Sequence, residues 1–276
     1  MPAVVPPARL AVIGGSGTQG GGFPAGLRDD VEVLETGLVF ETPYGESPPF
    51  QLFTLNGRPV LHVRMHGWRA GLPRGTASRQ VFWVLAQAGA GRILSEAGVG
   101  SLNHLLDPGD LVVCDDFVDM TSDRAGEGVL GGRLLIMRQP VCPVGRAALL
   151  DSARRLAPDR RLFARGTYVV TEGPRFESPA EVRHLQGLGD VVGQSFSPEV
   201  WLARDIGAHY AGIYLIVNYG EGVVHDWSHA ELKARFTDDA ALMGAIVLDA
   251  LATVAEIADD DAGCDCLELR PPSLLR

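Results

Sequence analysis

Residues 10–17 have the sequence LAVIGGSG, in which an apolar run leads directly into a glycine-rich turn. This is the pattern of a buried strand that ends at a tight turn. Farther along the chain, apolar β-branched runs alternate with segments of helical periodicity. The alternation predicts an α/β fold, in which a mixed but mainly parallel sheet is flanked by helices.

The same patterns give the approximate bounds of each element. We expect strands at 10–13, 51–55, 59–63, 92–96, 111–114, 167–171, 190–192 and 210–217. We expect helices at 76–88, 145–156, 179–185, 198–206 and from 228 to about 257. Ser228 and Glu231 have the spacing of a capping box at the start of the last helix.

No composition shift, linker or internal repeat divides the chain. Although 276 residues exceed the usual length of one domain, open α/β sheets reach this size undivided. We therefore expect a single domain over 1–276, in which 1–9 form a peripheral leader and 259–276 a peripheral tail.

The balance of charges excludes one class of partner. The chain has 24 Lys and Arg against 34 Asp and Glu, a formal net charge of −10. Such a field repels nucleic acid but leaves room for a small anion at a local site. No run of roughly 18 apolar residues offers a membrane span, and the proline-broken residues 1–9 do not resemble a secretory leader. We expect a cytoplasmic protein with no nucleic-acid or membrane partner.

Cysteines are few, and their spacing does not indicate a metal site. Cys264 and Cys266 lie close together near the end of the chain, whereas Cys114 and Cys142 stand alone. The close pair has neither the spacing nor the partner ligands of a zinc site, and the seven histidines are scattered. We interpret the pair as surface thiols, with a small disulfide as the alternative, and expect no metal.

Two glycine-rich turns follow expected strands. Gly14 to Gly17 could bring backbone N–H groups and the Ser16 hydroxyl to an anion, although a tight turn without a ligand fits equally well. Gly98 to Ser101 would form a second turn, and Asp107 to Asp110 a β-turn into the next strand. Because ligands bind at the carboxyl ends of strands in open α/β sheets, the two turns together predict a small pocket.

The segment Thr171 to Glu177 places a carboxylate, an arginine and an aromatic ring just past a strand. Phe176 beside the polar Glu172 would suit a flat heterocycle with hydroxyls; the alternative is an ordinary connection with Phe176 in the core and Glu172 paired to an arginine. Asn218 follows the last buried strand, where its carboxamide could donate to and accept from one edge of a base. Taken alone, it would more often be a turn residue.

Together these motifs resemble the methylthioadenosine phosphorylase branch of the purine nucleoside phosphorylase family. The matching pieces are IGGSG at 13–17, ETPYG at 41–45, Arg64 before His66-Gly67, GSL at 100–102, PGDLV at 108–112, Asp119 with Thr121, EGPRFES at 172–178, SPEVWLAR at 197–204 and Cys264-Asp265-Cys266. The resemblance implies a phosphorylase-like α/β domain, a homotrimer with active sites at subunit interfaces, no cofactor, and inorganic phosphate as co-substrate.

The resemblance also implies roles for individual residues in phosphorolysis of a purine nucleoside. Ser16, Arg64 and Ser195 would bind phosphate. The remaining positions would contact the nucleoside: Gly98, Glu172, Phe176 stacked on the base, Gln194 beneath the ribose, Asn218 at the purine N7, and His229 and Leu232 at the 5′ end. Of these residues, Asn218, Arg64 and Ser16 would be the catalytic ones.

Several positions depart from the family pattern. Met65 replaces an expected histidine, with His66 one place late, and Ala97 replaces a phosphate-binding threonine. Asn218 replaces the aspartate of adenine-specific members, which shifts the expected substrate toward a 6-oxopurine nucleoside, with a 5′ modification. The segment between Asp119 and Cys142 is shorter than in typical members, which predicts a rebuilt 5′ end of the pocket. Together with the change at position 218, this means that standard methylthioadenosine is not the expected preferred substrate.

These departures leave two alternatives to a phosphorylase. Because Met65 and Ala97 each remove an anion-binding group, the chain could be a phosphate-independent nucleoside hydrolase or an enzyme of specialised nucleoside metabolism. The number of changed positions also allows a non-catalytic nucleoside-binding homologue. Dependence of turnover on phosphate separates the first alternative from a phosphorylase, and any turnover at all excludes the second.

Overall fold

A computed structural model describes residues 4–19, 22–122, 128–131, 134–257 and 263–271. Its centre is one mixed sheet, in which the neighbours β10-β8-β13-β7-β1-β6-β5-β2 are paired in that order, and β12, β11 and β9 branch from β7. The strands are β1 (Leu10–Gly14), β2 (Val31–Leu38), β5 (Phe50–Leu55), β6 (Arg58–Arg64), β7 (Arg92–Ser101), β8 (Leu111–Val112), β9 (Asp116–Asp119), β10 (Leu162–Phe163), β11 (Thr167–Val170), β12 (Val191–Gly193) and β13 (His209–Tyr219). A separate pair consists of β3 (Glu41–Thr42) and β4 (Gly45–Glu46).

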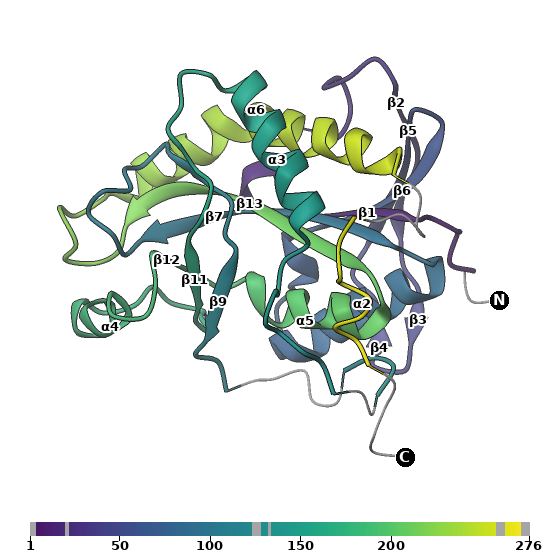
Figure 1. Ribbon diagram of the computed structural model, residues 1–276, viewed down its shortest axis with the longest axis horizontal. Coiled ribbons are helices and arrows are strands. Elements are labelled where there is room, and N and C mark those ends of the chain that lie inside the picture. Colours follow the sequence, from purple (N-terminus) through teal and green to yellow (C-terminus); the bar gives the residue numbers. More distant parts are fainter. Residues whose placement is uncertain (1–3, 20–21, 123–127, 132–133, 258–262, 272–276) are drawn as a thin grey trace.

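Helices cover both faces of this sheet (Figure 1). In the view of Figure 1, α3 and α6 lie above the sheet and α2 and α5 below it. The helices are α1 (Ser16–Gln19), the 3-10 turn η1 (Met65–Gly67), α2 (Arg74–Ala88), α3 (Pro143–Leu156), α4 (Pro179–Leu185), α5 (Phe196–Ile206) and α6 (His229–Ala255). The predicted α/β class is confirmed, since β1 pairs in parallel with β6 and β7, and β7 with β13.

The two central strands are longer than the sequence pattern indicates. β7 continues through the glycines at 98 and 100 because β13 pairs with it as far as Tyr219 and β12 pairs with it from the other side. The expected turn at Gly98 to Ser101 is therefore wrong. The expected β-turn after it is confirmed, since the Asp110 N–H donates to the Asp107 carbonyl over 3.0 Å.

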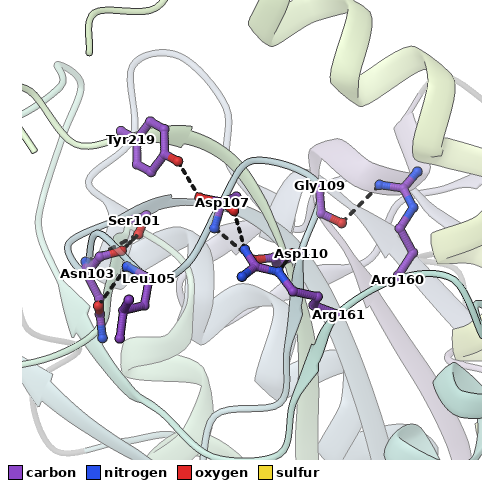
Figure 2. A network of polar contacts seen from close by, with 9 residues as sticks. All are labelled: Ser101, Asn103, Leu105, Asp107, Gly109, Asp110, Arg160, Arg161 and Tyr219. Atoms are coloured by element: carbon purple, nitrogen blue, oxygen red, sulfur yellow. Dashed lines mark hydrogen bonds and ion pairs between the residues drawn. The ribbon is translucent and has the colours of Figure 1, made fainter. Parts of the chain in front are cut away.

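A polar network fixes the loop between β7 and β8 against the end of β13 (Figure 2). Tyr219 donates its hydroxyl to Asp107, and Arg161 contacts both Asp107 and Asp110. Arg160 donates to the Gly109 carbonyl over 2.9 Å. These contacts hold the carboxyl ends of β7 and β13 side by side, and the candidate site lies at that edge.

The end of the chain packs on the body, unlike the expected peripheral tail. Within its described part, 263–271, Cys266 and Leu269 are buried. Ile136 donates its N–H to the Leu269 carbonyl over 3.0 Å, and Arg270 donates to the Asp205 carbonyl over 2.7 Å. Of the expected leader, residues 1–3 lie outside the described part of the chain. No helix among the described residues has the length and apolar character needed to cross a membrane.

Candidate active site

A cavity of about 290 Å³ opens at the carboxyl ends of β1, β7 and β13. Ser16, just past β1, lines one side, and Asn218 near the end of β13 lines another. Five further residues predicted from the sequence also line the cavity: Gly98, Phe176, Gln194, Ser195 and Leu232. The pocket predicted from the glycine-rich segments is therefore present, with most of the expected lining.

Arg64 is the first exception, since it does not line this cavity. Its side chain is exposed and borders a neighbouring hollow, which shares Met65 and Trp68 with the cavity. The backbone explains the change, because Met65 and His66 both have left-handed φ values, 49° and 55°. The chain reverses there immediately after β6 and directs His66, not Arg64, to the cavity wall.

Glu172 and His229 also lie outside the cavity. The Glu172 carboxylate accepts from the Ser122 hydroxyl over 2.7 Å, which holds it against the loop after β9. His229 is the first residue of α6 and is exposed to solvent. Leu232, three residues later and almost one helical turn on, is buried and faces the cavity instead.

One end of the cavity carries the buried His66, which lies one position later in the sequence than the histidine of the family pattern. The Nδ1 atom of His66 lies 2.7 Å from Oε1 of Glu199, whose Oε2 accepts from the Tyr210 hydroxyl over 3.0 Å. The Nε2 atom of His66 has no hydrogen-bond partner among the described residues. When both ring nitrogens carry a proton, Nδ1–H donates to Glu199 and Nε2–H can donate to an anion in the cavity.

Ser195 adds a second donor at this end. Its hydroxyl lies 3.0 Å from that of Tyr168, and its backbone N–H donates to the same tyrosine oxygen over 3.4 Å. Burial raises the pKa of Tyr168, so the phenol keeps its proton and can donate it to Ser195. The Ser195 hydroxyl proton is then free to point into the cavity.

The glycine-rich segment after β1 is used differently from the expectation. Its Gly15 and Thr18 N–H groups donate to the buried Glu96 carboxylate over 2.6 and 2.9 Å, so they are not available to an anion. A Cβ on Gly17 would lie 2.1 Å from Oε2 of Glu96, which explains the glycine there. Burial raises the pKa of Glu96. In this segment, the groups that remain able to donate a hydrogen bond to an anion are those of Ser16 and the backbone next to it.

The other end of the cavity is built for a flat ring. A register shift in β13 between Ile216 and Asn218 breaks the strand alternation, so that Val217 and Asn218 both line the cavity. Asn218 is only 3% exposed, and one N–H of its amide donates to the Tyr219 carbonyl over 2.7 Å. The remaining amide hydrogen and the amide oxygen are left to recognise a ligand.

Aromatic side chains close this end. Phe176 is 53% exposed, so it is not the core residue of the alternative interpretation, and its ring packs edge-on against Trp227 at 4.7 Å. Phe236 of α6 lies so close to β7 that a Cβ on Gly98 would come within 2.3 Å of its ring. Gly98 is thus required by the approach of the helix to the strand.

Sequence reasoning missed several residues of the site. Glu199 lies within SPEVWLAR and Tyr210 is the second residue of β13, but only the fold places them behind His66. Trp68, Glu177, Glu221 and Phe236 also line the cavity. Glu177 lies within the segment Thr171 to Glu177, and Glu221 lies three residues past Asn218, so their proximity to Phe176 and Asn218 is a signal that could have found them.

The cysteine interpretation is also corrected. Cys266 is buried, and Cys264 is only partly exposed, so they are not surface thiols. Their sulfur atoms lie beside Cys142 and His209, far from the pair in sequence. The spacing along the chain could not indicate these two partners, because α3, β13 and the tail meet only in the folded protein.

Comparisons with known proteins identify relatives of this chain. A family model described as the phosphorylase superfamily matches residues 9–252. A protein of Thermococcus kodakarensis named a probable 6-oxopurine nucleoside phosphorylase is 35% identical over 78% of this chain and 80% of its own. An S-methyl-5'-thioadenosine phosphorylase of Pyrococcus horikoshii is 34% identical over 76% and 79%. The fold is similar to that of methylthioadenosine phosphorylase from Schistosoma mansoni, with a TM-score of 0.79 at 24% identity, covering 95% of this chain and 97% of that one.

Proposed function

Because the chain belongs to the phosphorylase superfamily, we propose that it cleaves the N-glycosidic bond of a purine nucleoside by attack of inorganic phosphate at the anomeric carbon. The observation that carries the proposal is the division of one cavity into an end with imidazole and hydroxyl donors and an end with a carboxamide and aromatic rings. Phosphate and a purine need these two surroundings, and the ribose would lie between them, above Gln194.

The residues stabilise separated charge in this mechanism. His66, Ser16 and Ser195 would hold phosphate on one side of the sugar, while Arg64 supplies positive charge from the adjoining hollow. As the glycosidic bond breaks, the Asn218 amide would donate to N7 of the departing purine. Positioning and placed hydrogen bonds thus provide the catalysis, and no covalent enzyme intermediate is needed.

We further propose that the purine is a 6-oxopurine. A carboxamide both donates and accepts, so Asn218 can bind N7 and the adjoining 6-oxopurine edge, whereas it has no acidic proton to give to an adenine. The name of the Thermococcus kodakarensis relative supports this class. Leu232 adds an apolar side chain to the cavity wall, which suits a hydrophobic 5′ substituent.

Phosphorolysis assays test both the proposed reaction and the proposed 6-oxopurine base. Methylthioinosine, inosine and methylthioadenosine are compared with and without phosphate, and products are identified by mass spectrometry. We expect a sugar 1-phosphate, strict dependence on phosphate, and higher kcat/KM for the 6-oxopurine nucleosides. Faster use of methylthioadenosine would contradict the base assignment but not the reaction.

A second candidate, a nucleoside hydrolase, is favoured by one observation. Glu96 takes up the Gly15 and Thr18 N–H groups and places a carboxyl group beneath the expected anion site. If water replaces phosphate, free sugar forms at an unchanged rate when phosphate is removed. The assay above distinguishes the two reactions directly.

We also propose a homotrimeric, cytoplasmic enzyme with no organic cofactor, on the strength of its resemblance to the family. Light scattering coupled to size-exclusion chromatography measures the assembly. Turnover by protein stripped of small molecules, with nucleoside and phosphate alone, tests the cofactor expectation.

A further inference from the structure

Three cysteines and a histidine converge at the amino end of β13, whereas the cavity lies at its carboxyl end. Cys142 caps α3, His209 begins β13, and Cys264 and Cys266 follow α6 in the tail. Their sulfur atoms and one imidazole nitrogen all lie within 4.8 Å of one another. His209 and Asn218 stand at opposite ends of β13, so this cluster and the cavity are separated by roughly 30 Å of strand.

We propose that these four residues form a structural zinc site of the Cys₃His type. The Cys142 and Cys264 sulfurs are 3.7 Å apart, and Nδ1 of His209 lies 3.7 and 3.3 Å from them. Around a tetrahedral zinc with Zn–S of about 2.3 Å and Zn–N of about 2.0 Å, the edges are about 3.8 Å for S···S and about 3.5 Å for S···N. A disulfide instead needs sulfurs about 2.05 Å apart.

The surroundings of the cluster suit a metal–thiolate group of net negative charge. Three thiolates and Zn²⁺ sum to one negative charge, and the buried Arg204 guanidinium hydrogen-bonds to Cys266. Its other hydrogen bonds include the neutral Gln139 and Pro140 carbonyls, over 2.6 and 3.3 Å. An anionic metal site would balance the charge of this arginine, which a pair of neutral thiols would not.

Cys142 also stands at the N-terminus of α3, where the helix dipole favours a metal-bound thiolate. Only thiolates bind zinc, so the thiol protons of the three cysteines would pass to solvent as the metal binds.

Such a site would join three distant parts of the chain. In Figure 1 the yellow tail runs past α5 toward the C-terminus, and Arg270 contacts the carbonyl of Asp205 in α5. Zinc would fix this tail to α3 and β13 by metal bonds in addition to those hydrogen bonds. Structural zinc contributes directly to the free energy of folding, so its removal should lower the melting temperature.

Metal content tests the proposal without reference to activity. The full chain is purified under reducing conditions, loaded with Zn²⁺, dialysed and analysed for metal. We expect about one zinc per chain in the wild type and in the control Asp265→Asn, which changes the residue between the two cysteines. We expect roughly tenfold less after Cys264→Ser with Cys266→Ser, and the same loss in His209→Gln.

Cobalt gives a second readout that remains decisive if the variants fold poorly. Co²⁺ bound to thiolates in a tetrahedral site gives intense charge-transfer and ligand-field absorption, which we expect in the wild type and which zinc should abolish. Wild-type protein that takes up neither metal under reducing conditions would overturn the proposal. So would an intact mass two hydrogens lower in the reduced, zinc-loaded protein after denaturation, with peptide mapping that places the disulfide among Cys142, Cys264 and Cys266.

Discussion

At the scale of single residues, the candidate active site depends on a backbone reversal. Two consecutive left-handed residues, Met65 and His66, are unusual for side chains larger than glycine. Because of this turn, Arg64 is exposed and the buried His66 lies at the cavity wall instead, where Glu199 holds its imidazole in place. His66, one place later in the sequence than the family pattern expects, thus reaches the position where the proposed mechanism places an anion donor.

The Glu199 contact with His66 predicts an effect on phosphate binding. In Glu199→Gln no charge balances an imidazolium, so we expect the KM for phosphate to rise roughly ten- to hundredfold, the worth of a charged hydrogen bond. Initial-rate kinetics at varied phosphate measure it. Tyr210→Phe removes only the neutral hydroxyl on the other carboxylate oxygen and should change this KM much less. An unaltered phosphate KM in Glu199→Gln would show that His66 does not bind the nucleophile.

Asn218 predicts a change of base preference. Asn218→Asp supplies a carboxyl group that can protonate N7 of adenine, an effect of general acid catalysis worth about 10²–10⁴. We expect kcat/KM for methylthioadenosine to rise relative to methylthioinosine by at least about tenfold. Competition assays with both nucleosides in one reaction measure the ratio. If the ratio stays constant, Asn218 does not select the base.

At the scale of elements, the sequence predicted what local patterns determine. The capping box at Ser228 is present, with the Glu231 N–H donating to Ser228 and the Glu231 carboxylate accepting from the Ser228 N–H. The strand at 10–13 and the helix at 179–185 lie where periodicity placed them. Edge elements such as β2 were missed, because its mostly exposed side chains carry little apolar alternation.

The remaining features depend on contacts between distant segments. Gly98 and Gly100 have the composition of a turn but are strand residues, because β12 and β13 pair with β7 on both sides. Likewise, no local pattern distinguishes Glu199 as the partner of His66, which is 133 positions away. The residues that line the cavity were predicted where they belong to a sequence motif, and they were missed where only tertiary packing brings them together.

The start of α6 links stability to the cavity, since this helix supplies Leu232 and Phe236 to the wall. Ser228→Ala removes the cap and should cost about 1 kcal/mol in the free energy of unfolding. We also expect a raised nucleoside KM, because the first turn frays. Denaturant titration and kinetics measure the two effects. Thr253→Ala, on the same helix, removes a hydroxyl that donates to the Asp249 carbonyl within that helix and should be nearly neutral.

At the scale of the whole molecule, buried titratable groups set how stability depends on pH. His62 lies fully buried in β6, and burial, with a smaller effect of Arg64, lowers its pKa from 6.5 to about 3. Between these values the unfolded chain binds a proton that the folded protein excludes. Stability from His62 is therefore complete above pH 6.5 and is lost as the pH falls toward 3.

This loss predicts the acid sensitivity of the fold. From pH 7 to 5 the free energy of unfolding of the wild type should fall by about 2 kcal/mol more than that of His62→Gln, which has no proton to take up on unfolding. Denaturant titrations at pH 7, 6 and 5 give the difference. His104→Gln, at an exposed position, should follow the wild type. Parallel curves for wild type and His62→Gln would mean that the folded protein protonates this imidazole, and that the sheet around β6 admits a charge.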